Sequence, residues 1–136
     1  MDTLKTAGAA HILYVEDNAD NRILVQRVLE AAGYRVTLAN DPHTGLALAE
    51  AHRPDLVLMD INLPGMDGYA MTARLKAIPE YQSLRIVALT ANVMKGDYER
   101  TLVAGCDGYI QKPIDVDALP GQIAHYLDLR FLSSTP

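Results

Sequence analysis

The stretch Leu56-Val57-Leu58-Met59-Asp60 decides the fold, because four consecutive apolar residues end abruptly at a carboxylate. An uninterrupted apolar run of this length is typical of a strand that is buried on both faces, as in a parallel sheet covered by helices. The sequence predicts five such strands, at His11–Val15, Arg35–Ala39, Leu56–Met59, Arg85–Leu89 and Gly108–Gln111.

Helical segments separate these strands. Residues Asn21 to Ala32 place Leu24 and other apolar side chains on one side of a helix with a period of 3.6. The pair Asp41-Pro42 is typical of a helix start, and this helix is expected to run to about His52. Further helices are expected after Gly68, over about Lys95–Ala104 and from near Asp117. Alternating strands and helices predict an α/β fold, a doubly wound parallel sheet between helices.

The length of 136 residues fits one globular domain. We expect this domain to span residues 11–128, with an N-terminal extension over 1–10 and a loosely held C-terminal tail over 129–136. No output domain is expected.

Composition narrows the class of partner. The chain has 17 acidic and 12 basic residues, a formal net charge of −5, and no basic cluster. Binding to nucleic acid or to an anionic membrane is therefore not expected, and a protein or a small ion is the expected partner. Cys106 is the single cysteine, so no intramolecular disulfide can form. No apolar run approaches the roughly 18 residues of a membrane span, and the start lacks a signal-peptide pattern, so we expect a cytoplasmic protein.

Polar residues follow four of the five predicted strands. The first strand ends in Glu16-Asp17, the third in Asp60 and the fourth in Thr90, and the fifth runs into Lys112-Pro113. In open α/β sheets, ligands bind outside the carboxyl ends of the strands. If the first and third strands are neighbours, three carboxylates, a hydroxyl and an ammonium meet at one edge of the sheet.

This group of side chains has a definite chemistry. Three crowded carboxylates repel one another, and one lysine cannot neutralise them, so a hard divalent cation is the natural counter-ion. Mg²⁺ is the best candidate because it prefers oxygen ligands and completes its octahedron with water and phosphate oxygens. A carboxylate beside Mg²⁺ and lysine can attack a phosphoryl group, which predicts an aspartyl phosphate.

The residues that carry this chemistry give the chain a family resemblance. The chain resembles the receiver domain of two-component response regulators over about residues 11–128, and in particular the single-domain, chemotaxis-regulator-like members. The resemblance depends on the ordered set of motifs: Glu16-Asp17, Asp60 followed by Leu63-Pro64-Gly65-Met66-Asp67-Gly68, Thr90-Ala91 and Lys112-Pro113. It implies a flavodoxin-like sheet with strand order 2-1-3-4-5.

The resemblance also implies roles at the metal site. Asp60 would be the phosphoacceptor and a metal ligand, and Asp17 would hold Mg²⁺ directly. Glu16 would bind the ion directly or through water, and Asn62 would offer its backbone carbonyl.

Other residues would bind the phosphoryl group or respond to it. Lys112 would pair with its oxygens, and Thr90 and the backbone amides near Asn62 and Ala91 would donate hydrogen bonds. Pro113 is expected to follow a cis peptide bond. Tyr109 matches the family's aromatic switch position and would rotate inward as Thr90 moves toward the phosphoryl group.

Asn92, Asn62 and Ile23 complete the set of predicted site residues. Asn92 and Asn62 lie where the family tunes access of water to the phosphoryl group. Ile23 lies opposite the apolar side of the first helix, so we expect it to be exposed, and we interpret it as part of a docking contact with the phosphodonor. That donor would be a sensor histidine kinase or a histidine phosphotransfer protein. An unidentified downstream protein would bind the face formed by the fourth helix, fifth strand and fifth helix.

Each motif alone also has an ordinary structural interpretation. Glu16-Asp17 could favour a helix start, Asp60 could end a strand, Thr90 could cap a turn and Lys112 could be a solvated cation. Tyr109 could simply pack, and Cys106 is interpreted as a small buried hydrophobic residue. We favour the joint functional interpretation because four such groups at matching strand ends are typical of a site.

Three alternatives remain open at the level of the whole protein. The chain could be a receiver excised from a hybrid histidine kinase. It could be a phosphohydrolase of the haloacid dehalogenase type, although the nucleophile of that class follows the first strand and Asp60 follows the third. It could also be a flavin-binding module, although the acidic loop after the first strand would repel flavin phosphate.

Overall fold

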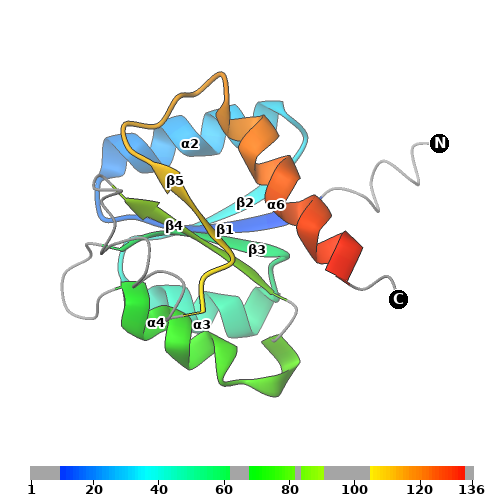
Figure 1. The fold of residues 1–136 in the computed structure, drawn as a ribbon. Coiled ribbons are helices and arrows are strands. Elements are labelled where there is room, and N and C mark those ends of the chain that lie inside the picture. Colours follow the sequence, from blue (N-terminus) through cyan, green and yellow to red (C-terminus); the bar gives the residue numbers. More distant parts are fainter. Residues whose placement is uncertain (1–9, 62–67, 82–83, 91–104, 134–136) are drawn as a thin grey trace.

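The sheet has the predicted strands and the predicted order. The computed structural model describes residues 10–61, 68–81, 84–90 and 105–133 (Figure 1). All five strands pair in parallel, in the order β2-β1-β3-β4-β5. Their bounds are β1 His11–Val15, β2 Arg35–Ala39, β3 Leu56–Asp60, β4 Arg85–Thr90 and β5 Gly108–Gln111. The α/β fold class and the order 2-1-3-4-5 are therefore confirmed.

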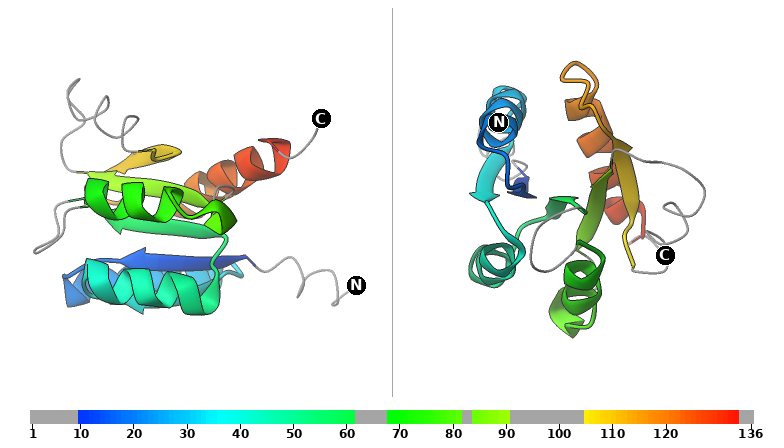
Figure 2. Two further views of the ribbon diagram at one scale, coloured as in Figure 1. Left: turned by 90° about the horizontal axis from the view of Figure 1, so that it is seen from below. Right: turned by 90° about the vertical axis from the view of Figure 1, so that its left-hand side faces the viewer.

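Helices cover both faces of this sheet. On one face lie α2 (Ala19–Ala31) and α6 (Leu119–Ser133), and on the other lie α3 (Pro42–His52) and α4 (Gly68–Lys76), as Figures 1 and 2 show. A short 3-10 turn, Pro79–Tyr81, follows α4. The expected helix over about 95–104 lies outside the described residues.

The apolar core explains why β3 is hydrophobic without interruption. Successive side chains of a strand point to opposite faces. Leu56 and Leu58 pack in the cluster under α2 and α6, whereas Val57 and Met59 pack in the cluster under α3 and α4. All four are fully buried. The strand therefore has no solvent face, as its sequence predicts.

Side-chain caps set where two helices start. Asn18 accepts a hydrogen bond from the N–H of Asn21 at 2.9 Å, so α2 begins before the predicted Asn21. Asp41 accepts from the N–H of Thr44 at 2.7 Å, which confirms the predicted start of α3. The prediction that Leu24 belongs to the apolar side of α2 is wrong. The buried residues Val25 and Leu29 define that side, and Leu24 is 44% exposed.

The last helix starts later and runs further than predicted. The Asp115 carboxylate accepts hydrogen bonds from the N–H groups of Asp117 and Ala118, at 3.0 and 3.3 Å. This turn occupies the predicted start, and α6 begins at Leu119. The helix continues to Ser133, past the residue at which a C-terminal tail was expected to begin. None of the described helices is long and apolar enough to cross a membrane.

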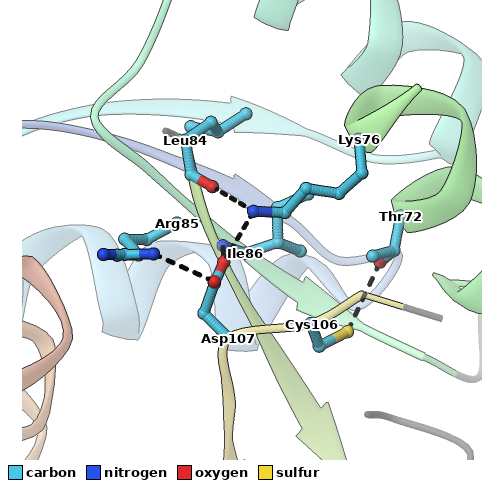
Figure 3. Close-up of polar contacts among 7 residues, drawn as sticks. All are labelled: Thr72, Lys76, Leu84, Arg85, Ile86, Cys106 and Asp107. Atoms are coloured by element: carbon cyan, nitrogen blue, oxygen red, sulfur yellow. Dashed lines mark hydrogen bonds and ion pairs between the residues drawn. The ribbon is translucent and has the colours of Figure 1, made fainter. Parts of the chain in front are cut away.

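A charged network ties the amino ends of β4 and β5 to α4. Asp107, just before β5, accepts from Lys76 of α4 at 3.0 Å and from Arg85 of β4 at 3.1 Å (Figure 3). Asp107 Oδ2, the oxygen that pairs with Lys76, also accepts a hydrogen bond from the backbone N–H of Ile86 at 2.8 Å. Beside it, Cys106 is buried, as predicted. The network lies at the opposite edge of the sheet from the predicted site.

Candidate active site

The carboxyl ends of four strands deliver the predicted side chains. Glu16 follows β1 directly, Asp60 and Thr90 are the last residues of β3 and β4, and Lys112 follows β5. Backbone hydrogen bonds extend the ladder past two strand ends. The N–H of Glu16 donates to the carbonyl of Ala39 at 2.9 Å, and the N–H of Lys112 donates to that of Thr90 at 2.7 Å. The site residues are thus held by the sheet itself.

Three carboxylates converge at this edge. One oxygen each from Glu16, Asp17 and Asp60 lie within 4.8 Å of one another. Glu16 is 1% exposed and Asp60 3% exposed, whereas Asp17 faces solvent. Within residues 10–61, 68–81, 84–90 and 105–133, this is the one acidic, histidine or cysteine group with metal-binding spacing. The predicted convergence of these side chains is confirmed.

Lys112 provides positive charge next to Asp60. Its Nζ donates to Asp60 Oδ2 at 2.5 Å, and its side chain is 25% exposed. The peptide bond between Lys112 and Pro113 is cis, as predicted. A lysine is a compact point charge with three donors, which suits it to bind phosphoryl oxygens.

Glu16 is held by two hydrogen bonds. The Tyr14 hydroxyl donates to Oε1 at 2.9 Å, and the backbone N–H of Asn18 donates to Oε2 at 3.2 Å. Burial raises the pKa of Glu16, the Tyr14 hydrogen bond lowers it, and the negative charge of Asp60 raises it further. A positive ion beside Glu16 would favour its charged form.

The residues fit a divalent cation on their chemistry alone. Ionised Glu16, Asp17 and Asp60 carry three negative charges, and Lys112 supplies one positive charge, so the group has an excess of two negative charges. All of the carboxylate donors are oxygens, the ligand type that Mg²⁺ prefers. One acid faces solvent, so waters and phosphate oxygens can complete the coordination.

Two residues near the site were missed by the sequence analysis. Tyr14 lies on the same strand face as Glu16, which is two residues further along the chain. A buried tyrosine needs a hydrogen-bond partner for its hydroxyl, and this requirement could have pointed to Tyr14 in the sequence. Arg22 donates from Nη1 to the backbone carbonyl of Glu16 at 2.7 Å. No sequence pattern singles out Arg22, because the contact depends on how α2 leaves the loop.

The remaining predicted residues fall into two groups. Thr90 is buried at the end of β4, and Tyr109 of β5 is partly buried with its backbone carbonyl accepting from the Tyr126 hydroxyl at 3.0 Å. Ile23 is 47% exposed, which confirms its predicted exposure. Asn62, Ala91 and Asn92 lie outside the described residues.

A cavity of about 570 Å³ opens beside the acidic cluster. Its lining joins the start of α2 to the segment after β5: Asn21, Leu24, Lys112, Pro113 and Ile114. The exposed side chain of Leu24 and the side chain of Lys112 therefore line the same cavity.

Fold and site together define a class: doubly wound α/β proteins with a cluster of carboxylates, spaced as metal ligands are, at the carboxyl edge of the sheet. The family model of the response regulator receiver domain matches residues 12–124. The polar-differentiation response regulator DivK of Brucella anthropi is 42% identical over 116 residues, which cover 85% of this chain and 94% of that relative.

Solved structures agree. The chemotaxis response regulator CheY4 of Vibrio cholerae matches with a TM-score of 0.83 and 27% identity, covering 87% of this chain and 98% of that chain. The receiver domain of the sensor histidine kinase PA1611 from Pseudomonas aeruginosa, with a magnesium ion coordinated in its active site cleft, matches with a TM-score of 0.80 and 37% identity, covering 89% and 99%. The chain therefore belongs to the family of response regulator receiver domains, which are signalling proteins of two-component systems.

Proposed function

We propose that this receiver accepts a phosphoryl group from a phosphohistidine donor onto Asp60, in a reaction that depends on Mg²⁺. The observation that carries the proposal is the position of the Asp60 carboxylate. It is buried, pairs with Lys112 and lies within 4.8 Å of ligand oxygens of Glu16 and Asp17.

The chemistry follows from these neighbours. A carboxylate oxygen of Asp60 attacks phosphorus, the phosphorus–nitrogen bond of the donor breaks, and the imidazole nitrogen keeps the electron pair. Lys112 holds the phosphoryl oxygens as a point charge, and the Thr90 hydroxyl donates a hydrogen bond to one of them. Glu16, Asp17 and Asp60 would hold Mg²⁺.

The rest of the site completes this assignment. The backbone carbonyl of Asn62 would be a further metal ligand, and the backbone amides near Asn62 and Ala91 would donate hydrogen bonds to the phosphoryl group. Asn92 and Asn62 set the access of water to it. An Mg²⁺ ion held by Glu16, Asp17 and Asp60 would supply positive charge to stabilise the charge that develops on the phosphoryl group.

Phosphorylation is read out by a change in shape. The added group brings roughly −1.5 to −2 charge and draws Thr90 inward, and Tyr109 then rotates to fill the space behind it. This movement alters the face formed by the predicted fourth helix, β5 and α6, where a downstream protein binds. An unchanged Tyr109 rotamer in structures with and without a phosphoryl mimic would exclude this switch.

The donor protein docks beside the cavity. Ile23 and Leu24 are exposed apolar side chains on α2, and Leu24 lines the cavity that reaches Lys112. A sensor histidine kinase or a histidine phosphotransfer protein is the proposed partner, in the cytoplasm. The 37% identity to a receiver of a sensor histidine kinase supports a second context, a receiver within a hybrid kinase. The mass of the natural protein distinguishes the two contexts.

The test is intact-mass measurement after incubation with acetyl phosphate and Mg²⁺. We expect one phosphoryl group on the unsubstituted chain and none on Asp60→Asn. Asp20→Asn is the matched control, because Asp20 is an exposed carboxylate in the first turn of α2 and should leave labelling unchanged. No labelling of the unsubstituted chain, or labelling that persists in Asp60→Asn, contradicts the proposal.

A further inference from the structure

Tyr14 carries a hydroxyl between two aliphatic residues of β1. Its neighbours in β1, Leu13 and Val15, are aliphatic, and Tyr14 itself is fully buried in the cluster under α2 and α6. β1 lies between β2 and β3, so this strand is an interior strand of the sheet. Its hydroxyl donates to Glu16 Oε1 at 2.9 Å.

Packing does not require this hydroxyl. A phenylalanine would fill nearly the same volume, and burying a hydroxyl without a partner costs about 1–3 kcal/mol. In the described part of the chain, the acceptor for Tyr14 is the Glu16 carboxylate. The hydroxyl therefore has a function at Glu16 that the apolar core does not supply.

The effect on Glu16 is to fix a flexible carboxylate. A free glutamate side chain has three rotatable bonds, and ordering a long side chain costs up to about 2 kcal/mol. Tyr14 holds Oε1 and the N–H of Asn18 holds Oε2, at 3.2 Å. Each carboxylate oxygen has two lone pairs, so both oxygens keep a free position for another ligand.

We propose that Tyr14 is a positioning residue that holds the Glu16 carboxylate ready for Mg²⁺. This inference rests on the proposed function, since it concerns the same metal site. Tyr14 does not touch the ion. It orders the Glu16 side chain before the ion binds. The loss of side-chain entropy then occurs during folding and does not reduce the affinity for Mg²⁺. Removing an outer hydrogen bond of this kind typically weakens metal affinity by 10- to 100-fold.

The experiment compares Mg²⁺ affinity in Tyr14→Phe and in the unsubstituted full chain by titration calorimetry. We expect a loss of about 10-fold in affinity. Tyr81→Phe is the matched control, because it removes another buried tyrosine hydroxyl, 3.5 Å from the carbonyl of Ala49 and in the other core cluster. Its Mg²⁺ affinity should match that of the unsubstituted chain.

Two further readouts separate positioning from a general loss of stability. In a Glu16→Gln background, Tyr14→Phe should change Mg²⁺ affinity by less than about 2-fold, because the two residues act through one ligand. The chain has no tryptophan, so tyrosine absorption can be followed directly. Mg²⁺ should perturb the tyrosine spectrum of the unsubstituted chain and of Tyr81→Phe, and this change should be lost in Tyr14→Phe.

The outcomes distinguish this inference from the proposed function. Equal Mg²⁺ affinities, a Tyr14→Phe chain that does not fold, or an equal loss in the Glu16→Gln background would each overturn the role of Tyr14. The same is true if the unsubstituted chain binds no Mg²⁺. Phosphoryl transfer is scored separately by intact mass. Labelling without an effect of Tyr14 removes only the positioning role, and an effect of Tyr14 without labelling removes only the proposed phosphoryl acceptance.

Discussion

The three carboxylates of this site lie close together but differ in solvent exposure and in their hydrogen-bond partners. Asp60 is buried against Lys112, Asp17 is exposed, and Glu16 is buried with a tyrosine as its hydrogen-bond donor. These differences assign different tasks to three residues of similar chemistry. The buried Asp60, held by a cation, is suited to be the nucleophile, and the exposed Asp17 is suited to hold an ion that keeps several waters.

At the same scale, Ile23 allows a test of donor docking. Ile23→Asp places a charge on the proposed docking contact, so we expect phosphoryl transfer from the cognate phosphohistidine protein to slow by about 10-fold, equivalent to about 1.4 kcal/mol. Labelling by acetyl phosphate should not change, because that small donor needs no docking surface. Transfer rates followed by quenched-flow or gel assays measure the first effect and intact mass the second.

The control for this variant is Ala51→Asp. It puts the same charge on an exposed position of α3, on the other face of the sheet. Its transfer rate should equal that of the unsubstituted chain. If Ile23→Asp and Ala51→Asp behave alike, Ile23 is not part of the docking contact.

At the scale of elements, α4 is attached to the sheet by charge as well as by apolar packing. Asp107 joins Lys76 of α4 to Arg85 of β4 and accepts from the backbone of Ile86 (Figure 3). The three charged side chains are between 12% and 20% exposed, so water screens them only partly. An ion-pair network of this kind holds one helix and two strand starts in a single arrangement.

Asp107→Asn should therefore destabilise the fold. It leaves two partly buried cations without their anion, and we expect the free energy of unfolding to fall by about 2 kcal/mol. Denaturation in urea, followed by circular dichroism, measures the change. Glu80→Gln is the control, because it breaks the Arg53–Glu80 pair, whose side chains are 69% and 65% exposed. That loss should be below about 0.5 kcal/mol, and equal losses would show that the network adds nothing beyond a surface pair.

At the scale of the whole molecule, stability should depend on pH through His11. This side chain is buried at the amino edge of the sheet, with its Nε2 2.6 Å from Thr37 Oγ1. Burial lowers the pKa of His11, and the nearby Arg35 and His52 lower it further, while Asp55 works against them. The unfolded chain then binds more protons than the native chain below the ordinary histidine pKa of 6.5.

The sign follows from this proton difference. The stabilising contribution of neutral His11 is complete above the unfolded pKa and is lost as the pH falls through the folded pKa. Urea midpoints measured between about pH 7.5 and pH 5.5 should fall, and the fall should be shallower in His11→Gln. His43→Gln, at an exposed histidine of α3, should retain the full dependence. An unchanged slope in His11→Gln would contradict this role.

Most of the fold could be predicted because its signals are local. The interior strands β1, β3 and β4 are short, mainly apolar runs, and Asp41 marks the start of α3 with its own side chain. The predictions failed where a boundary depends on a particular contact. The Asp115 carboxylate bonds to the backbone where α6 was expected to start, and the buried side of α2 turned out to be centred on Val25 and Leu29, leaving Leu24 exposed.

The sequence by itself determined the class of this protein, because residue type and order along the chain are enough to place Glu16, Asp17, Asp60 and Lys112 at the ends of strands. Only the tertiary structure decided how these groups are held. The hydrogen bond from Tyr14 to Glu16 joins residues two apart on one strand face, and the pair between Lys112 and Asp60 joins two strands that are not adjacent in the sheet. Such contacts depend on the direction of each side chain and on the order and register of the strands in the sheet, which residue order alone does not specify.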